Sequence, residues 1–215
     1  MRCLATLLIF LIHTSILAPV YSSEILQKHK KYAIRYSEID DLKLSNTIDF
    51  SHEFKEGLIK MSDTLNIKLT YLLTVFHVET VGTFEPDKKS PIGATGLIQF
   101  TSSTARGLGT TTTKLSLMTR TEQLKYVAMY FDRIIKYYGP LNTLEDVFMA
   151  VHYPACIRSN LYSVIYKEGS KAYYNNRFND RNNDGYVSKF EITSFVRSIY
   201  KKYYHNIILT NDRSI

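Results

Sequence analysis

A single glutamate stands in a run of apolar residues, TVFHVETVGTF, at positions 74–84. A carboxyl group in apolar surroundings favours its neutral form, so its pKa rises. Glu79 could therefore stay protonated near neutral pH and donate a proton to a leaving oxygen. A solvated surface glutamate is the alternative that the residue type alone leaves open.

A glycine-rich loop, SPIGATGLIQF, follows this glutamate from Ser90 to Phe100. Gly93 and Gly96 would let the backbone approach a ligand closely, because glycine has no Cβ. Gln99 carries both hydrogen-bond donors and an acceptor, which suit hydroxyl and N-acetyl groups. A neutral carboxyl, a close backbone and an amide are the components of a groove that cleaves sugar chains, although such a loop can also be an ordinary connection.

A second chemical feature lies downstream, in the twelve residues DRNNDGYVSKFE from Asp180 to Glu191. Oxygen-bearing side chains stand at positions 1, 3, 5, 9 and 12 of this stretch, and a glycine stands at position 6, which is the spacing of an EF-hand calcium loop. Position 7 would contribute its backbone carbonyl. The expected Ca²⁺ ligands are Asp180, Asn182, Asp184, Tyr186, Ser188 and Glu191.

No second loop of this kind is visible, so we expect one structural Ca²⁺ site that fixes the helix from residue 191 to residue 204. A polar turn before a helix is the alternative.

The elements that must position these residues are predicted to be helices. Apolar residues recur at helical spacing along much of the chain, and a capping box at Thr119–Glu122 and a stop at Gly139–Pro140 bound one of the helices. No segment alternates convincingly as a strand. Helices are predicted at 53–65, 69–79, 119–138, 142–151 and 191–204, with a short one near 103–108.

The ordered motif HVETVGTFEPDKKSPIGATGLIQFTSSTARGLGTT resembles the catalytic core of the soluble lytic transglycosylase family, lysozyme-like enzymes that cleave peptidoglycan. The family pattern is a glutamate and a small hydroxyl residue, then F-x-P, then S-x-x-G-A-x-G-L-x-Q-F, then a threonine-alanine pair. Thr80 replaces the usual serine. The matching residues are Glu79, Thr80, Phe84, Pro86, Ser90, Gly93, Ala94, Gly96, Leu97, Gln99, Phe100, Thr104 and Ala105.

The resemblance spans about Leu69 to Glu191. It implies a mainly α, lysozyme-like helical domain with a C-terminal EF-hand-like loop and helix, similar to phage-type members of the family. It also implies that Glu79 alone cleaves the bond between N-acetylmuramic acid and N-acetylglucosamine and leaves a 1,6-anhydro sugar. The alternatives are a water-using muramidase, and a non-catalytic calcium-binding wall protein that keeps the fold.

The resemblance further implies a set of substrate-binding residues. In MAVHYPACI, two residues take roughly the places of a tyrosine and an asparagine in the family's alanine-tyrosine-asparagine motif. Which of the two faces Glu79 stays open, and His152 as a core histidine is the alternative. The implied set is Ser90, Gly93, Gly96, Gln99, Phe100, His152 and Tyr153.

The N-terminus has the layout of a secretory signal peptide, with Arg2 before an apolar run that Pro19 ends. An uncleaved anchor is the alternative. We expect a signal peptide at 1–22, a polar linker at 23–50, the transglycosylase domain at 51–166, the calcium segment at 167–204 and a tail at 205–215. The protein would then be exported, to the periplasm, the cell envelope or the medium, with no stable membrane insertion after cleavage.

The composition bounds the partners. The 215 residues carry a formal charge of +7, but the lysines and arginines are scattered without a basic-aromatic repeat, which argues against nucleic acid. Cys156 alone would remain after signal cleavage, so no intrachain disulfide is expected. A basic exported protein suits an anionic envelope polymer or a membrane surface, or simply has a solvated surface. We expect a monomer that acts on peptidoglycan.

Overall fold

The computed structural model describes residues 50–205, and within them the chain is mainly helical, as predicted. The strands are a single short pair. The α-helices are α2 (His52–Leu65), α3 (Leu69–Thr80), α4 (Ser102–Gly107), α5 (Thr112–Ser116), α6 (Arg120–Tyr138), α7 (Leu144–His152), α8 (Lys171–Asn176) and α9 (Lys189–Tyr203). Two 3-10 turns, η2 (Pro154–Cys156) and η3 (Arg177–Asn179), and two strands, β1 (Val164–Lys167) and β2 (Tyr186–Ser188), complete the described part.

The expected signal peptide, nearly all of the expected linker, and all of the expected tail except residue 205 lie outside the described residues. Among the helices that the structure describes, none has both the length and the apolar character needed to span a bilayer.

Local side-chain caps set where several helices begin. The hydroxyl of Thr119 accepts from the backbone N–H of Glu122, and the Glu122 carboxylate accepts in return from the N–H of Thr119, so the predicted capping box is present at the start of α6. Thr143 and Asp146 make the same reciprocal pair at the start of α7. These bonds satisfy backbone donors that the first turn of a helix leaves unpaired.

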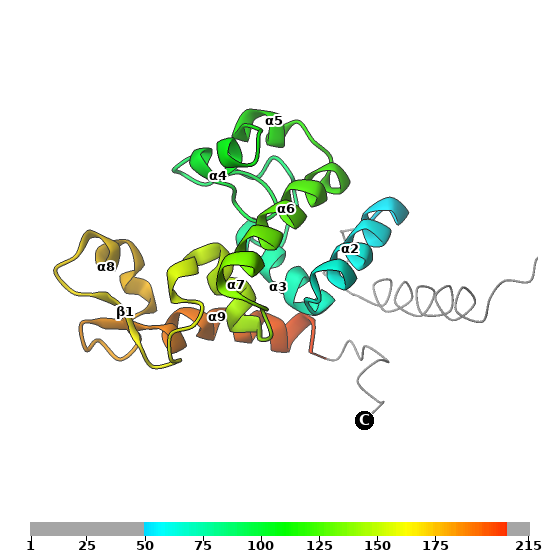
Figure 1. The fold of residues 1–215 in the computed structure, drawn as a ribbon. Helices are drawn as coiled ribbons and strands as arrows, with labels where there is room; N and C mark the ends of the chain where they lie inside the picture. The colour runs from blue at the N-terminus through cyan, green and yellow to red at the C-terminus, as the bar shows by residue number, and fades with distance from the viewer. Residues whose placement is uncertain (1–49, 206–215) are drawn as a thin grey trace, which may run out of the picture.

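Helix α3 lies at the centre of the packing (Figure 1). It contacts α2, α7 and α9, while α2 also packs along α6. Its side chains from Leu72 to Phe76 are buried, and they meet Phe131 of α6 and Val147 of α7 in one hydrophobic core. The helix that carries Glu79 is therefore held on several sides by apolar contacts.

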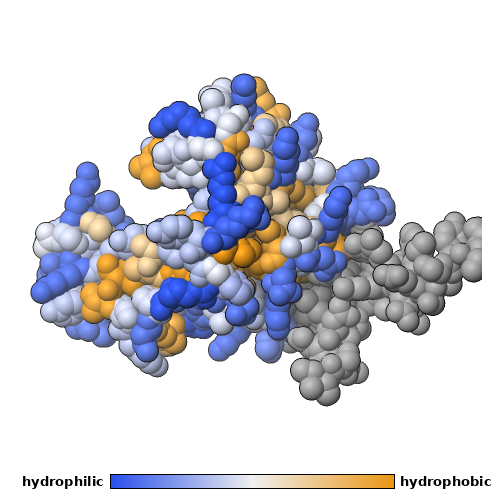
Figure 2. Space-filling view, viewed as in Figure 1, coloured by the Kyte–Doolittle hydropathy of each residue, from blue (hydrophilic) through white to orange (hydrophobic). Residues whose placement is uncertain are grey.

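Two outlying parts extend from these central helices. One carries α4 and α5, and the other carries α8 with the strands (Figure 1). Between the two parts the space-filling view has a notch, which lies above α7 (Figure 2).

The sequence did not predict α5, α8 or the strand pair. The two strands are antiparallel, with Tyr166 opposite Val187 and Lys167 opposite Tyr186, and the pairing is irregular around residue 165. Each strand is only three or four residues long, too short for a visible alternation. The expected boundary between 166 and 167 falls inside β1, which pairs with the Asp180–Glu191 loop through β2.

Candidate active site

Glu79 lies in the last turn of α3, where the buried face of the helix gives way to the surface. Burial raises the pKa of its carboxyl to about 7, and no other charged group contributes to this rise. Within residues 50–205 the carboxyl makes no hydrogen bond or ion pair. In this part of the chain, Oγ1 of Thr110 is the only side-chain polar atom that is fully buried and has no hydrogen-bond partner. The Glu79 oxygens, which also have no partner, are therefore not fully buried and still reach solvent. Glu79 can therefore hold a proton near neutral pH and present it to a molecule that arrives from solvent.

The helix ends immediately after Glu79 in a strained turn. Val81 takes the left-handed conformation with a φ of 56°, and the N–H of Gly82 donates to the carbonyl of His77 at 2.7 Å. A β-branched residue rarely adopts such a φ, and strain of this kind concentrates at functional sites. The side chain of Val81 is also 77% exposed, so an apolar group stands at the surface two residues after the carboxyl.

Thr80 explains why a hydroxyl residue follows the glutamate. Its buried hydroxyl donates to the carbonyl of Phe76 at 2.6 Å and accepts from the N–H of Phe84 at 2.9 Å. Arg120 of α6 then holds the same turn, since its Nε donates to the carbonyl of Phe84 and its Nη2 pairs with Glu85. The hydroxyl and the guanidinium together fix the chain that leaves Glu79.

The glycine-rich loop is braced largely by the residues that were expected to bind substrate. The Ser90 hydroxyl accepts from the N–H of Ala94, and the Gln99 amide donates to the carbonyls of Lys88 and Gly96. Phe100 is 1% exposed and packs in the core, so its ring offers no surface to a ligand. The loop residues thus form one wall of the candidate site. The groups that this wall can offer to a ligand are its backbone and the amide oxygen of Gln99.

Gln123 of α6 is the residue on which this wall depends, and sequence reasoning missed it. Its buried Oε1 accepts from the N–H of Leu97, and its Nε2 donates to the carbonyls of Pro86 and Leu115. A Cβ at Gly96 would lie 2.7 Å from Nε2 and closer still to Oε1, which explains the glycine. The sequence could have indicated it, because Gln123 directly precedes Leu124 on the face of α6 that is buried.

Tyr130 is a second residue that the sequence did not single out. Its hydroxyl donates to the carbonyl of Ala150 on α7 at 2.6 Å. Burial raises the pKa of Tyr130 to about 12, and the negative charges of Tyr138 and Glu79 add to the rise. Its phenol is therefore neutral and lies within electrostatic reach of Glu79. The bond from its hydroxyl to Ala150 joins α6 to the last turns of α7.

His152 and Tyr153 instead gather around Tyr166 of β1. The imidazole of His152 stacks on Phe148, and its Nε2 lies 3.1 Å from the Tyr166 hydroxyl. Tyr153 stacks on the Tyr166 ring and remains 41% exposed. Burial lowers the pKa of His152, so this ring is neutral at neutral pH. Among the described residues no hydrogen bond joins either of the two to Glu79.

The Asp180–Glu191 loop has the backbone and the oxygen atoms that a Ca²⁺ site needs. Buried Asp180 accepts from the Tyr173 hydroxyl and from the N–H groups of Asp184 and Gly185, and these bonds, led by Tyr173, lower its pKa. The Asn182 amide donates to Asp184 at 2.9 Å. Asp180 is thus an ionised carboxylate inside the turn, and Asn182 and Asp184 lie beside it.

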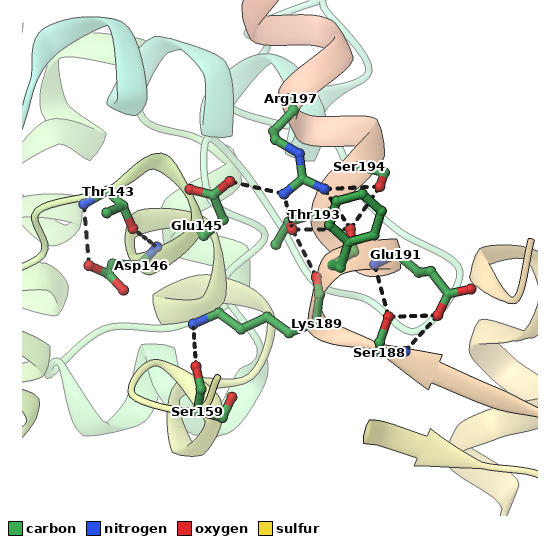
Figure 3. A network of polar contacts seen from close by, with 11 residues as sticks. Thr143, Glu145, Asp146, Ser159, Ser188, Lys189, Glu191, Thr193, Ser194 and Arg197 are labelled. Carbon is green, nitrogen blue, oxygen red and sulfur yellow. Dashed lines mark hydrogen bonds and ion pairs between the residues drawn. The ribbon is translucent and has the colours of Figure 1, made fainter. Parts of the chain in front are cut away.

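Glu191 takes part in a different contact. Its Oε2 accepts from the N–H and the hydroxyl of Ser188, which caps α9 (Figure 3), and its Oε1 accepts from the N–H of Arg181 at 3.3 Å. Within residues 50–205 no three acidic, histidine or cysteine side chains are gathered closely enough to hold a metal. The carboxylate, amide and hydroxyl oxygens of the loop are of the kind that Ca²⁺ prefers, but the carboxylates would have to draw together around the ion.

Helix α9 joins this loop to the rest of the molecule. Arg197 pairs with Glu145 of α7 at 2.9 Å, and Lys189 donates to the carbonyl of Ser159 (Figure 3). Lys189 also donates to the carbonyl of Ile157. At the end of the helix, the Tyr204 hydroxyl lies 3.0 Å from Nδ1 of His77, which precedes Glu79 by two residues on α3. The loop is thereby connected to the helix that carries the carboxyl.

Neither models of known protein families nor curated proteins show a match to this chain.

The packing of Gln123 against Gly96 predicts unequal effects of two alanine substitutions. Gly93 and Gly96 both have positive φ, 80° and 84°, so an alanine at either position is strained by ~1–2 kcal/mol. A Cβ at Gly93 meets nothing within 4 Å, whereas one at Gly96 collides with Gln123. We expect Gly96→Ala to lower the free energy of unfolding by a further ~1–3 kcal/mol relative to Gly93→Ala, measured by urea denaturation. Equal losses would contradict this packing.

The raised pKa of Glu79 predicts how stability depends on pH. Its pKa rises from 4.5 to about 7 on folding, so the folded state binds this proton more tightly. The contribution of this proton to the free energy of unfolding is fully present below the pKa of the unfolded chain, 4.5, and is lost as pH increases through the folded pKa of about 7. We expect the melting temperature of the wild type to fall over this range relative to Glu79→Gln, which does not titrate. Glu56→Gln, at an exposed position of α2, is the control and should follow the wild type.

Proposed function

We propose that this chain is an exported peptidoglycan lytic transglycosylase with Glu79 as its single catalytic acid. The observation that carries the proposal is a solvent-reachable carboxyl whose pKa burial raises to about 7, at the position where the motif places the family's catalytic glutamate. We also propose that this part of the chain is a lysozyme-like domain and that the Asp180–Glu191 loop is EF-hand-like.

In the proposed reaction Glu79 acts first as an acid and then as a base. The neutral carboxyl donates its proton to the oxygen between N-acetylmuramic acid and N-acetylglucosamine, and that glycosidic bond breaks. The acetamido group of the substrate stabilises the oxocarbenium-like centre. The Glu79 carboxylate then takes the proton of the C6 hydroxyl, whose oxygen closes onto C1 to form the 1,6-anhydro sugar. The carboxyl ends as it began, and no water is consumed.

The surroundings of Glu79 favour a route with one acid. Ordinary glycosidases use two carboxyl groups about 5–10 Å apart, and a second ionised group so close would alter the pKa of the first. The pKa of Glu79 is raised by burial without such a contribution. The Tyr130 hydroxyl donates its proton to the carbonyl of Ala150, so that proton is not available to stabilise the ionised carboxylate of Glu79.

We further propose that one Ca²⁺ ion stabilises the Asp180–Glu191 loop. The ion would be held by side-chain oxygens of the loop and by the Tyr186 carbonyl, and its effect would be structural. Helix α9 begins inside this loop and ends against α3, so ordering the loop supports the helix that carries Glu79.

Substitution of the catalytic acid tests the reaction. Glu79→Gln keeps the size of the side chain but removes the proton to be donated, and general acid catalysis contributes ~10²–10⁴-fold. We expect cleavage of purified peptidoglycan to fall by at least this factor, while Glu56→Gln retains wild-type activity. Mass spectrometry of the released muropeptides should show anhydro ends. Reducing ends would indicate a water-using muramidase, and unchanged turnover in Glu79→Gln would remove Glu79 from the mechanism.

Melting curves in chelator and in millimolar calcium test the metal. A ligand that binds only the folded protein stabilises it by ~2.7 kcal/mol at a hundredfold excess over its dissociation constant. Extracellular sites bind at ~10⁻⁴–10⁻³ M, which sets the concentration range. We expect calcium to raise the melting temperature of the wild type and of Glu56→Gln.

Glu191→Gln should lose most of this calcium response. It is preferable to alanine because the amide oxygen can still accept from Ser188 and cap α9, so the variant separates the metal from the cap. Wild-type curves that do not respond to calcium or chelator would exclude the site.

A further inference from the structure

A hollow of about 530 Å³, which we call the loop pocket, lies beside the Asp180–Glu191 loop. Its walls come from the residues before and within β1, from the loop, and from the first turns of α9. None of its lining residues belongs to the motif around Glu79. The lining residues that matter here are Tyr162, Arg181, Tyr186 and Phe190. Asn182, Asp184, Ser188 and Glu191 also line the pocket and belong to the expected Ca²⁺ ligands, as does the backbone carbonyl of Tyr186.

One side of the loop pocket is aromatic and exposed. Tyr162 is 73% exposed, and its ring lies nearly parallel to that of Phe190, at 26° with 5.7 Å between the centroids. The guanidinium of Arg197 sits 4.5 Å from the Phe190 centroid and fixes that ring. Figure 2 shows apolar surface over this region, where Figure 1 places the strands and the start of α9. Exposed rings held in place in this way are typical of binding sites.

The other side of the loop pocket is polar and has unused hydrogen-bonding groups. Within the described residues, the Arg181 guanidinium and the hydroxyls of Tyr162 and Tyr186 have no hydrogen-bond or ion-pair partner. Asp184 also faces the pocket, but it accepts from the Asn182 amide and belongs to the expected Ca²⁺ ligands. The groups left for a ligand are therefore the donors of Arg181, Tyr162 and Tyr186, which stand within the same hollow as the rings.

We propose that the loop pocket binds N-acetylated sugar units of a glycan strand. A pyranose ring has an apolar face of C–H groups that can lie on Tyr162, and its hydroxyl and acetamido oxygens match the free donors of Arg181 and Tyr186. A lipid tail or an apolar helix would bury the Arg181 guanidinium without a partner, which is costly. A bare cation would make no use of the rings.

This inference rests on the proposed function, since it concerns the same glycan. A second contact outside the cleavage site raises the effective concentration of the strand at Glu79. The loop pocket would therefore increase binding to the polymer without taking part in bond cleavage.

The test uses the full chain with Glu79→Gln, so that nothing is cut during measurement. Tyr162→Ala and Phe190→Ala are added separately, and Phe178→Ala is the matched control, because Phe178 is a 77% exposed aromatic of the same region that does not line the loop pocket. Binding is measured by titration with a chitin tetramer and by sedimentation with insoluble peptidoglycan, in millimolar calcium. We expect about tenfold weaker binding for the two pocket variants and no change for the control.

Amide chemical shifts supply a second readout that does not depend on a variant. We expect the chitin tetramer to shift signals of residues 162–164 and 182–190. Undiminished binding by both pocket variants, together with unshifted signals there, would overturn the proposal. If the wild type cleaves peptidoglycan while the pocket variants bind normally, only this inference fails. If the pocket variants lose chitin binding while the wild type cleaves nothing, the proposed catalytic function fails instead.

Discussion

The desolvated carboxyl of Glu79 is the constraint on which the rest of the described structure depends. A carboxyl keeps its proton near neutral pH only if water is largely excluded from it and no cation or donor stabilises its ionised form. The buried face of α3 supplies that exclusion, because Leu72 to Phe76 are buried in a helix packed against α2, α7 and α9. The helix then stops within one residue of Glu79, so that the carboxyl still reaches solvent.

The turn and the loop that follow Glu79 are held by polar contacts that replace regular secondary structure. Thr80 closes the turn, Arg120 anchors it, and Gln123 bonds three backbone groups from three different segments. Buried backbone groups are costly to leave unpaired, so each of these side chains takes the place of a helix or strand bond. A wall built in this way can leave its outer backbone edge open, as it is at Gly93.

Helix α9 connects the Asp180–Glu191 loop to the surroundings of Glu79. Its start carries the cap formed by Ser188 and Glu191, and its end meets His77 through Tyr204. The Asp180–Glu191 loop is therefore linked to the helix that carries Glu79 through α9 rather than by a direct contact. The same helix provides the Phe190 side of the loop pocket.

The sequence by itself determined the helical class, the positions of α2, α3, α6, α7 and α9, and the environment of Glu79. These features depend on apolar periodicity and on caps such as Thr119–Glu122, whose partners lie within four positions along the chain. Only the tertiary structure showed that Gln123 fills the space beside Gly96, that the Tyr130 hydroxyl donates to Ala150, and that His152 joins Tyr166. The partners in these contacts are far apart along the chain: 14 positions separate His152 from Tyr166, and 26 separate Leu97 from Gln123. No local sequence pattern therefore encodes these contacts. Short strands and an exposed aromatic hollow arise from the same long-range packing, because a four-residue segment has too little periodicity to specify its partner.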